Sequence, residues 1–182
     1  TEDQLNTILV AATECPTKQN IPFYSVVVVQ DRDIIEAIYE QTAAFGLDGK
    51  TVSRHNPQVL ANTLLVFTEH DFDRDVEARS PETGALKKER TEEQLEILAA
   101  DRNQALGIAS GYVNLAASLV GLDTGCCKCM NAPAVQKILA IDEMPLLLMG
   151  VGFKDETKNR REDHKTGQMI ESYSKNINVT II

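Results

Sequence analysis

The sequence predicts an α/β or α+β sandwich, in which helices cover a central sheet. Amphipathic helical segments alternate along the chain with short β-branched, apolar segments that have the length of buried strands. Capping signals and Gly or Pro residues separate these segments. At 182 residues, of which 43% are hydrophobic, the chain suits a single domain, so we expect residues 1–182 to form one unit.

The chain opens with a predicted helix over residues 2–14. Thr1 and Gln4 stand at the spacing of a capping box, and an apolar stripe follows them at helical spacing. Residues 15–22 contain two prolines, which oppose helix, and we expect a loop there. Residues 23–29 are β-branched and nearly all apolar, which predicts a strand buried on both faces.

A second helix and a second strand follow. Asp31 or Asp33 caps a helix whose isoleucines share one face, and we expect this helix to close at Gly46. A polar loop then leads through His55 and Asn56. The run at residues 63–68, TLLVFT, predicts another buried strand.

A highly charged stretch occupies residues 69–96. It is either a solvated surface excursion or a lid or extra dimer contact. Thr91 and Gln94 repeat the capping-box spacing, so a helix is expected to restart there and to meet the next helix near Arg102.

That next helix is rich in small side chains and leads into a cysteine cluster. Gly107 and Gly111 lie on one face, and each costs about 0.5–1 kcal/mol relative to Ala in a helix interior. We therefore expect a second backbone to approach this face. The helix ends at Gly121, and residues 122–129 are expected to carry Cys126, Cys127 and Cys129 as a loop to a functional site. An ordinary buried helix followed by an edge loop is the alternative.

The last third of the chain predicts a short helix and two strands. The helix begins at Asn131, and Pro145 is expected to stop it before a buried strand over residues 146–151. A charged segment reaches Lys165. Residues 177–182 predict an apolar strand, which must pair in its own subunit or in another.

Composition excludes several classes of protein. The formal net charge of −9 argues against nucleic acid or an anionic membrane as the main partner. No apolar run approaches the ~18 residues of a membrane-spanning helix. Cys15 stands apart from the three clustered cysteines, a pattern that is no disulfide framework, so we expect a reducing, cytoplasmic location.

Few residues suggest chemistry by themselves. No Gly-rich dinucleotide motif, phosphate loop or serine nucleophile motif is present. Cys126 and Cys129 have the C-x₂-C spacing of a metal site, but further ligands would have to come from afar, and we assign no metal. Small, reduced side chains lining a tight site are the preferred interpretation.

Histidines and one basic cluster complete the candidates. His55, His70 and His164 lie in polar segments and are expected at the surface. Lys158 and Arg160 could converge on one phosphate, although a solvated surface run explains them equally well. No side-chain acid or base stands out, so no catalytic residue is assigned.

The order of the motifs along the chain is more informative than any one of them. A helix is followed by the loop Cys15-Pro16-Thr17-Lys18-Gln19-Asn20-Ile21-Pro22 and a Val-rich strand; a small-residue helix ends in Leu119-Val120-Gly121-Leu122-Asp123-Thr124; and a strand ending Gly150-Val151-Gly152 precedes Lys158 and Arg160. This arrangement resembles the nitroreductase family of FMN flavoproteins over nearly the whole chain.

The resemblance implies a mostly antiparallel central sheet flanked by helices, in an interlocked homodimer whose core is the small-residue helix. It also implies an FMN site. Its residues would be Pro16, Thr17, Lys18 and Asn20 from the partner subunit, Asn56 near the pyrimidine edge, the backbone amides of Cys127, Lys128 and Cys129, and Lys158 and Arg160 on the phosphate.

The implied activity is that of an FMN-dependent NAD(P)H oxidoreductase. Hydride would pass through flavin N5 in ping-pong fashion to a small-molecule acceptor such as a nitroaromatic, a quinone or a flavin. A flavin-fragmenting or reductively dehalogenating relative is an alternative. A further alternative is a non-enzymatic dimer that binds flavin or metal.

Overall fold

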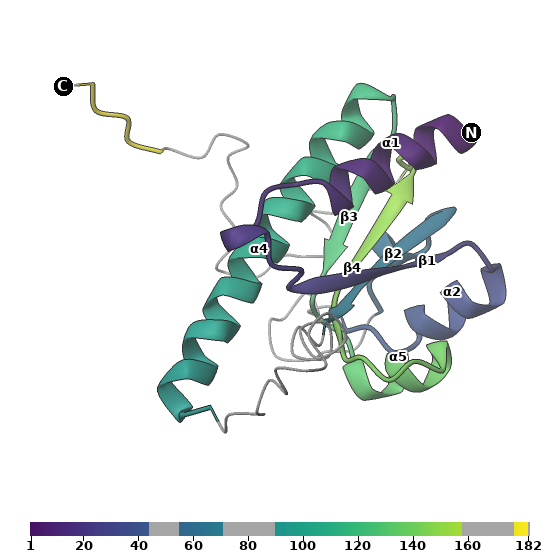
Figure 1. Cartoon of the computed structure of the whole chain (residues 1–182). Helices are drawn as coiled ribbons and strands as arrows, with labels where there is room; N and C mark the ends of the chain where they lie inside the picture. The colour runs from purple at the N-terminus through teal and green to yellow at the C-terminus, as the bar shows by residue number, and fades with distance from the viewer. Residues whose placement is uncertain (44–54, 71–89, 158–176, 182) are drawn as a thin grey trace.

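A four-stranded antiparallel sheet organises the protein (Figure 1). The computed structural model describes residues 1–43, 55–70, 90–157 and 177–181. The strand order is β1-β2-β4-β3. The strands are β1 (Tyr24–Val29), β2 (Thr63–Glu69), β3 (Asp123–Cys127) and β4 (Pro145–Gly152). The α+β fold with an antiparallel sheet, predicted from the sequence, is confirmed.

Helices cover both faces of this sheet. Helices α1 (Glu2–Thr13) and α4 (Glu92–Leu119) lie together on one face, and α2 (Arg32–Tyr39) and α5 (Ala132–Leu139) lie on the other, as Figure 1 shows. Two short 3₁₀ turns, η1 (Lys18–Asn20) and η2 (Pro57–Val59), complete the described elements.

The hydrophobic core is split into two layers by the sheet. Between the sheet and α1 and α4, the buried side chains are Ile8, Ala12, Cys15, Leu65, Phe67, Leu106, Ala109, Val113, Ala117, Leu147, Met149 and Val151. On the opposite face they are Val29, Ile35, Ile38, Val59, Leu64, Val66, Cys127, Val135 and Leu148. Alternate residues of β2 and β4 enter opposite layers, which explains why these central strands read as continuous apolar runs.

The capping predictions are confirmed at both long helices. Thr1 and Gln4 cap α1 reciprocally, and Thr91 and Gln94 do the same for α4. The predicted restart at Thr91 and the small-residue helix form one continuous helix of 28 residues. The charged excursion predicted over 69–96 was drawn too wide, because Glu69 belongs to β2 and α4 starts at Glu92; residues 71–89 lie outside the described residues.

The prediction that the first strand is buried on both faces was wrong. Only Val29 of β1 is fully buried, and Val28 remains 37% exposed. The reason is topological, since β1 is an edge strand and its outer side has no neighbour in the described sheet.

Two helix ends also differ from prediction. Helix α2 ends at Tyr39 rather than at Gly46, because Thr42 leaves the helix and forms a bridge with Met130. Helix α5 ends at Leu139, where Ala140 adopts a left-handed conformation (φ 51°), so Pro145 does not stop the helix; it begins β4.

The predicted C-terminal strand is not formed in the described residues. Residues 177–181 have no strand structure, and the side chains of Ile177, Val179 and Ile181 are 74–94% exposed. Pairing of this segment in another subunit stays a prediction.

The close approach expected at Gly107 and Gly111 does not occur among the residues that the structure describes. A Cβ atom added at either residue would meet nothing within 4 Å. This face of α4 is therefore open in a single subunit.

Among the residues that the structure describes, no helix has both the length and the apolar character needed to cross a membrane.

Candidate functional site

Thr42 connects the end of α2 to the segment that contains Asn56. Its hydroxyl Oγ1 donates to the carbonyl oxygen of Tyr39 at 2.7 Å and accepts from the backbone amide of Asn56 at 2.8 Å. His55 Nδ1 lies 2.9 Å from the carbonyl oxygen of Thr42, and because a carbonyl only accepts, the ring donates. The Thr42 side chain is buried, at 5% exposed.

The same residue meets the segment after β3. Thr42 and Met130 form an isolated antiparallel bridge, and the amide of Ala43 donates to the carbonyl of Cys129 at 2.7 Å. The structure thus brings together two of the segments expected to bind the flavin, Asn56 and residues 127–129, although they are distant in sequence.

Asn56 itself is a buried cap, 4% exposed. Its Oδ1 accepts from the amide of Gln58 at 3.0 Å, and its Nδ2 donates to Gln58 Oε1 at 3.3 Å, so the side chain begins the turn η2. This cap fixes the direction in which the chain enters η2.

Two glycines let η2 lie directly on the sheet. Gly125 of β3 and Gly150 of β4 are paired across the strands. A Cβ at Gly150 would stand 2.0 Å from the backbone oxygen of Gln58, and one at Gly125 would stand 2.7 Å from the Gln58 Cβ. These glycines are required for close backbone approach, and they place Asn56 next to the two strands.

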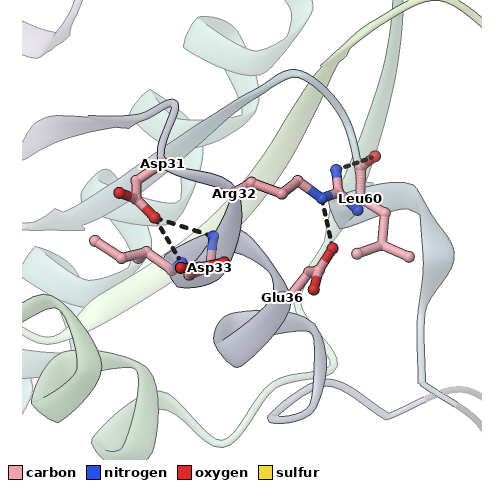
Figure 2. Close-up of polar contacts among 6 residues, drawn as sticks. Asp31, Arg32, Asp33, Glu36 and Leu60 are labelled. Carbon is pink, nitrogen blue, oxygen red and sulfur yellow. Dashed lines mark hydrogen bonds and ion pairs between the residues drawn. The ribbon is translucent and has the colours of Figure 1, made fainter.

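The start of α2 is tied to the end of η2 (Figure 2). Asp31 Oδ1 accepts from the amides of Asp33 and Ile34 and caps α2. Arg32 bonds Glu36 through Nε at 2.7 Å and the carbonyl oxygen of Leu60 through Nη1 at 3.3 Å. Helix α2 and η2 are therefore connected at two points. Arg32 bonds Leu60 at the start of α2, and Thr42 bonds Asn56 just after its end.

The first two cysteines of the cluster, Cys126 and Cys127, belong to an edge strand rather than to the predicted loop, and Cys129 follows that strand. Residues 123–127 pair with β4, so successive side chains alternate between faces. Cys127 enters the core, whereas Cys126 and Cys129 are exposed, and all four cysteines are free thiols. The strand was missed because Gly and Asp are rare in strands.

The chain just beyond β3 offers two consecutive backbone donors. Within the described residues, the amides of Lys128 and Cys129 form no hydrogen bond, and both residues are exposed. Adjacent unpaired N–H groups are suited to bind the carbonyl or ring nitrogen of a ligand.

The loop after α1 is tightly organised. Thr17 Oγ1 donates to the carbonyl of Ile21 at 2.8 Å, while Gln19 and Asn20 both adopt left-handed conformations (φ 55° and 56°). Consecutive positive φ values in non-glycine residues are uncommon and concentrate at functional sites.

An ion pair holds this loop on α4. Lys18 Nζ lies 2.6 Å from Asp101 Oδ2, with the two side chains 51% and 18% exposed. Pro16, Lys18 and Asn20 are exposed and Thr17 is half-buried. The described residues show no direct contact of this loop with Asn56 or with residues 127–129.

Below the same loop, Tyr24 is held by α1. Its hydroxyl donates to the carbonyl of Ala12 at 2.5 Å and lies 3.0 Å from Cys15 Sγ. Burial first, and then the Cys15 thiol, raises the pKa of Tyr24 above its usual value of 10.

The histidines were predicted at the surface, and the two that the structure describes are partly exposed but also contact neighbouring groups. His55 contacts Thr42 as above, and its Nε2 lies 3.1 Å from Glu40 Oε2. His70 Nδ1 lies 2.9 Å from the hydroxyl of Ser25 in a partly buried position. A polar flanking sequence does not reveal such contacts; His164 lies outside the described residues.

Lys158 and Arg160, expected to hold the phosphate, also lie outside the described residues. Sequence reasoning missed Thr42 and Asp101, which organise two of the candidate segments. No local signal marks either residue, because each acts through a partner far along the chain. The described part of the chain contains no group of three or more His, Cys, Asp or Glu residues arranged to hold a metal ion.

Comparison with solved structures finds the same fold in several flavin enzymes. The NfrA1 nitroreductase of Bacillus subtilis superposes with a TM-score of 0.65 at 18% identity, over 99% of this chain and 68% of that one. A protein described as an NAD(P)H:FMN oxidoreductase from Staphylococcus epidermidis gives 0.61 at 18% identity, over 93% and 82%. A protein described as a nitroreductase from Exiguobacterium sibiricum, in complex with FMN, gives 0.58 at 14% identity, over 87% and 80%.

Comparison with curated proteins finds no match. The model of the Nitroreductase family, by contrast, matches residues 1–153, which include every described helix and strand. This span contains the capped α1, the strained loop that follows it, the small-residue helix α4 and the paired strands β3 and β4. The chain therefore belongs to the nitroreductase family of flavin oxidoreductases.

Proposed function

We propose that this protein is an FMN-dependent NAD(P)H oxidoreductase that acts as a homodimer in the cytoplasm. It passes electrons by a ping-pong cycle to a small acceptor such as a nitroaromatic, a quinone or a flavin. Residues 1–182 form its single FMN-binding domain. The observation that carries the proposal is the pair of amides at Lys128 and Cys129, which form no hydrogen bond within the described residues and follow β3 near the buried Asn56.

The residues present fit an isoalloxazine ring. Two consecutive N–H donors suit the ring's carbonyl oxygen and nitrogen atoms, and a buried asparagine cap keeps the neighbouring backbone rigid. FMN, when bound, supplies the hydride chemistry; the protein binds the ring, orients it and tunes its electronics. The FMN complex of the Exiguobacterium relative supports this choice of cofactor.

The remaining proposed contacts come from the loop after α1 and from the charged segment after β4. Pro16, Thr17, Lys18 and Asn20 would reach the flavin of the partner subunit, and the φ values at Gln19 and Asn20 support a preformed binding loop. Lys158 and Arg160 would bind the phosphate as a pair of cations.

A homodimer is supported by the open face of α4. Tyr112, Leu115 and Leu119 follow helical spacing and are 48%, 63% and 78% exposed. Exposed apolar side chains gathered on one helix face mark an interaction surface. The open space at Gly107 and Gly111 lets a second backbone come close there.

The proposal is tested by the visible absorption spectrum of the protein after incubation with FMN and desalting. We expect the wild type to retain flavin absorbance and a Lys158→Ala/Arg160→Ala variant to lose it. Lys137→Ala, on the exposed side of α5, is the control and should retain flavin. A wild-type protein that retains no flavin would refute the proposal; one that retains it proceeds to a bleaching assay with NAD(P)H.

A further inference from the structure

We infer that Thr42 is a positioning residue for the flavin, acting through the segments that it joins. The Thr42 junction is defined here as Thr42 with His55, Asn56, Cys129 and Met130. The inference rests on the proposed function, because the flavin is assigned to the segments on either side of this junction. Both hydrogen bonds of the Thr42 hydroxyl are to backbone groups, of Tyr39 and of Asn56.

The hydroxyl of Thr42 acts as a hydrogen-bond donor and as an acceptor at the same time. It has one hydrogen, which goes to the carbonyl of Tyr39, and its oxygen accepts from the amide of Asn56. Both distances are below 3 Å, and the side chain is buried. No other described acceptor bonds the Asn56 amide, so loss of the hydroxyl would leave a buried donor unsatisfied.

The backbone of Thr42 serves the other side of the junction. Its bridge with Met130, and the bond from the Ala43 amide to the Cys129 carbonyl, hold the chain immediately after Lys128. The carbonyl of Cys129 is therefore fixed, while the amides of Lys128 and Cys129 bond no group in the described part of the chain. The same few atoms thus set the spacing between Asn56 and the two donor amides.

His55 closes the junction from its exposed side. Its ring donates to the Thr42 carbonyl, contacts Glu40 and lies 5.1 Å from the ring of Tyr39. The imidazole is 39% exposed, so substitutions there disturb the core less than substitutions of Thr42.

Two substitutions separate the hydroxyl from the shape of the side chain. Thr42→Val keeps the branched shape and removes the hydroxyl, whereas Thr42→Ser keeps the hydroxyl. Val135→Ala removes apolar volume from the core layer against which Met130 packs but changes no hydrogen-bonding group of the junction, and it serves as a control for loss of packing alone.

FMN affinity and the flavin absorption bands of the reconstituted proteins are the first readouts. We expect Thr42→Val to weaken FMN binding about tenfold and to shift the flavin bands, and Thr42→Ser to stay within about twofold of wild type. Val135→Ala should keep the wild-type flavin bands and FMN affinity even where its melting temperature falls as far as that of Thr42→Val. Wild-type binding by Thr42→Val, or an equal defect in Val135→Ala, would overturn the inference.

Amide hydrogen exchange of the protein without FMN separates this inference from the proposed function. We expect Thr42→Val to speed exchange at Asn56 and also at Ala43, whose amide bonds Cys129, while β2 amides stay protected. Unchanged exchange at Ala43 would show that Thr42 does not couple the two segments, whether or not FMN binds. If Thr42→Val does not fold, His55→Gln takes its place in both experiments, and unchanged FMN affinity there would also overturn the inference.

Discussion

The missing side chain at Gly150 decides how closely η2 can lie on the sheet. Gly150→Ala would drive a Cβ to 2.0 Å from the Gln58 backbone oxygen, a contact that only backbone movement relieves. We expect this variant to lower the free energy of unfolding by about 3 kcal/mol, as overpacking against backbone does. Urea denaturation measures the change.

Gly152 on the same strand provides the matched control. A Cβ there meets its neighbours at 3.5 Å or more, which is ordinary contact. Gly152→Ala should therefore change stability by less than about 1 kcal/mol. Equal losses in the two variants would argue against a specific close approach at Gly150.

Tyr24 makes the stability of the protein sensitive to alkaline pH. Burial and the Cys15 thiol raise the pKa of its hydroxyl in the folded state, so the folded protein holds this proton more tightly than the unfolded chain. The resulting stability is fully present below about pH 10, the pKa in the unfolded chain, and is lost as the pH rises toward the folded-state pKa.

Tyr24→Phe tests this coupling. We expect it to cost about 1 kcal/mol at neutral pH, through loss of the bond to Ala12, and to flatten the decline of stability above pH 10. Tyr39→Phe, at a tyrosine of α2 in the other core layer, should follow the wild-type curve. The measurement is the denaturation midpoint of each protein from pH 7 to pH 11. Parallel curves of midpoint against pH for wild type and Tyr24→Phe would contradict the prediction.

At the scale of one element, α4 serves two surfaces. Its buried side, which includes Ala109, Val113 and Ala117, packs on α1 and the sheet, while its open side carries Tyr112, Leu115 and Leu119. A helix with apolar residues on both sides suits the interior of an assembly better than the surface of a monomer. This accounts for the small residues, which let helices approach closely on either side.

Leu115→Asp tests the open side of α4. Leu115 is 63% exposed in the single subunit, so the fold of the monomer should change little, whereas a charge in the dimer core should prevent assembly. In sedimentation equilibrium we expect wild type at twice the 20.1 kDa mass of one chain and the variant at a single mass. Lys137→Asp on α5 is the charge control and should remain dimeric; a dimeric Leu115→Asp would place the interface elsewhere.

For the whole molecule, cofactor binding and assembly should be linked. If residues 16–20 of one subunit complete the flavin site of the other, a monomer holds only half of the contacts. Leu115→Asp should then lose FMN together with its partner, although it alters no proposed flavin contact. Retention of FMN by a monomeric variant would confine the site to one subunit.

Much of the architecture was predictable because it depends on local order. Helix caps at Thr1 and Thr91 need residues only three positions apart, and the apolar runs over residues 63–68 and 146–151 are long enough to identify central strands. The family resemblance also came from the linear order of short motifs, and the family match confirms it. The ends of α2 and α5 were predicted wrongly. The chain leaves α2 for a bridge between Thr42 and Met130, and α5 ends where Ala140 adopts a left-handed conformation.

Local sequence was thus sufficient for the fold class, the family and most of the strands, since periodicity and capping act over a few residues. Tertiary structure decided which strands lie at the edges, that Cys126 and Cys127 belong to β3, and that Thr42 joins Asn56 to the chain after β3. These features depend on contacts between segments far apart in sequence. The roles of Thr42 and Gly150 depend on Asn56 and Gln58, which are far from them in sequence, so only the folded structure shows these contacts.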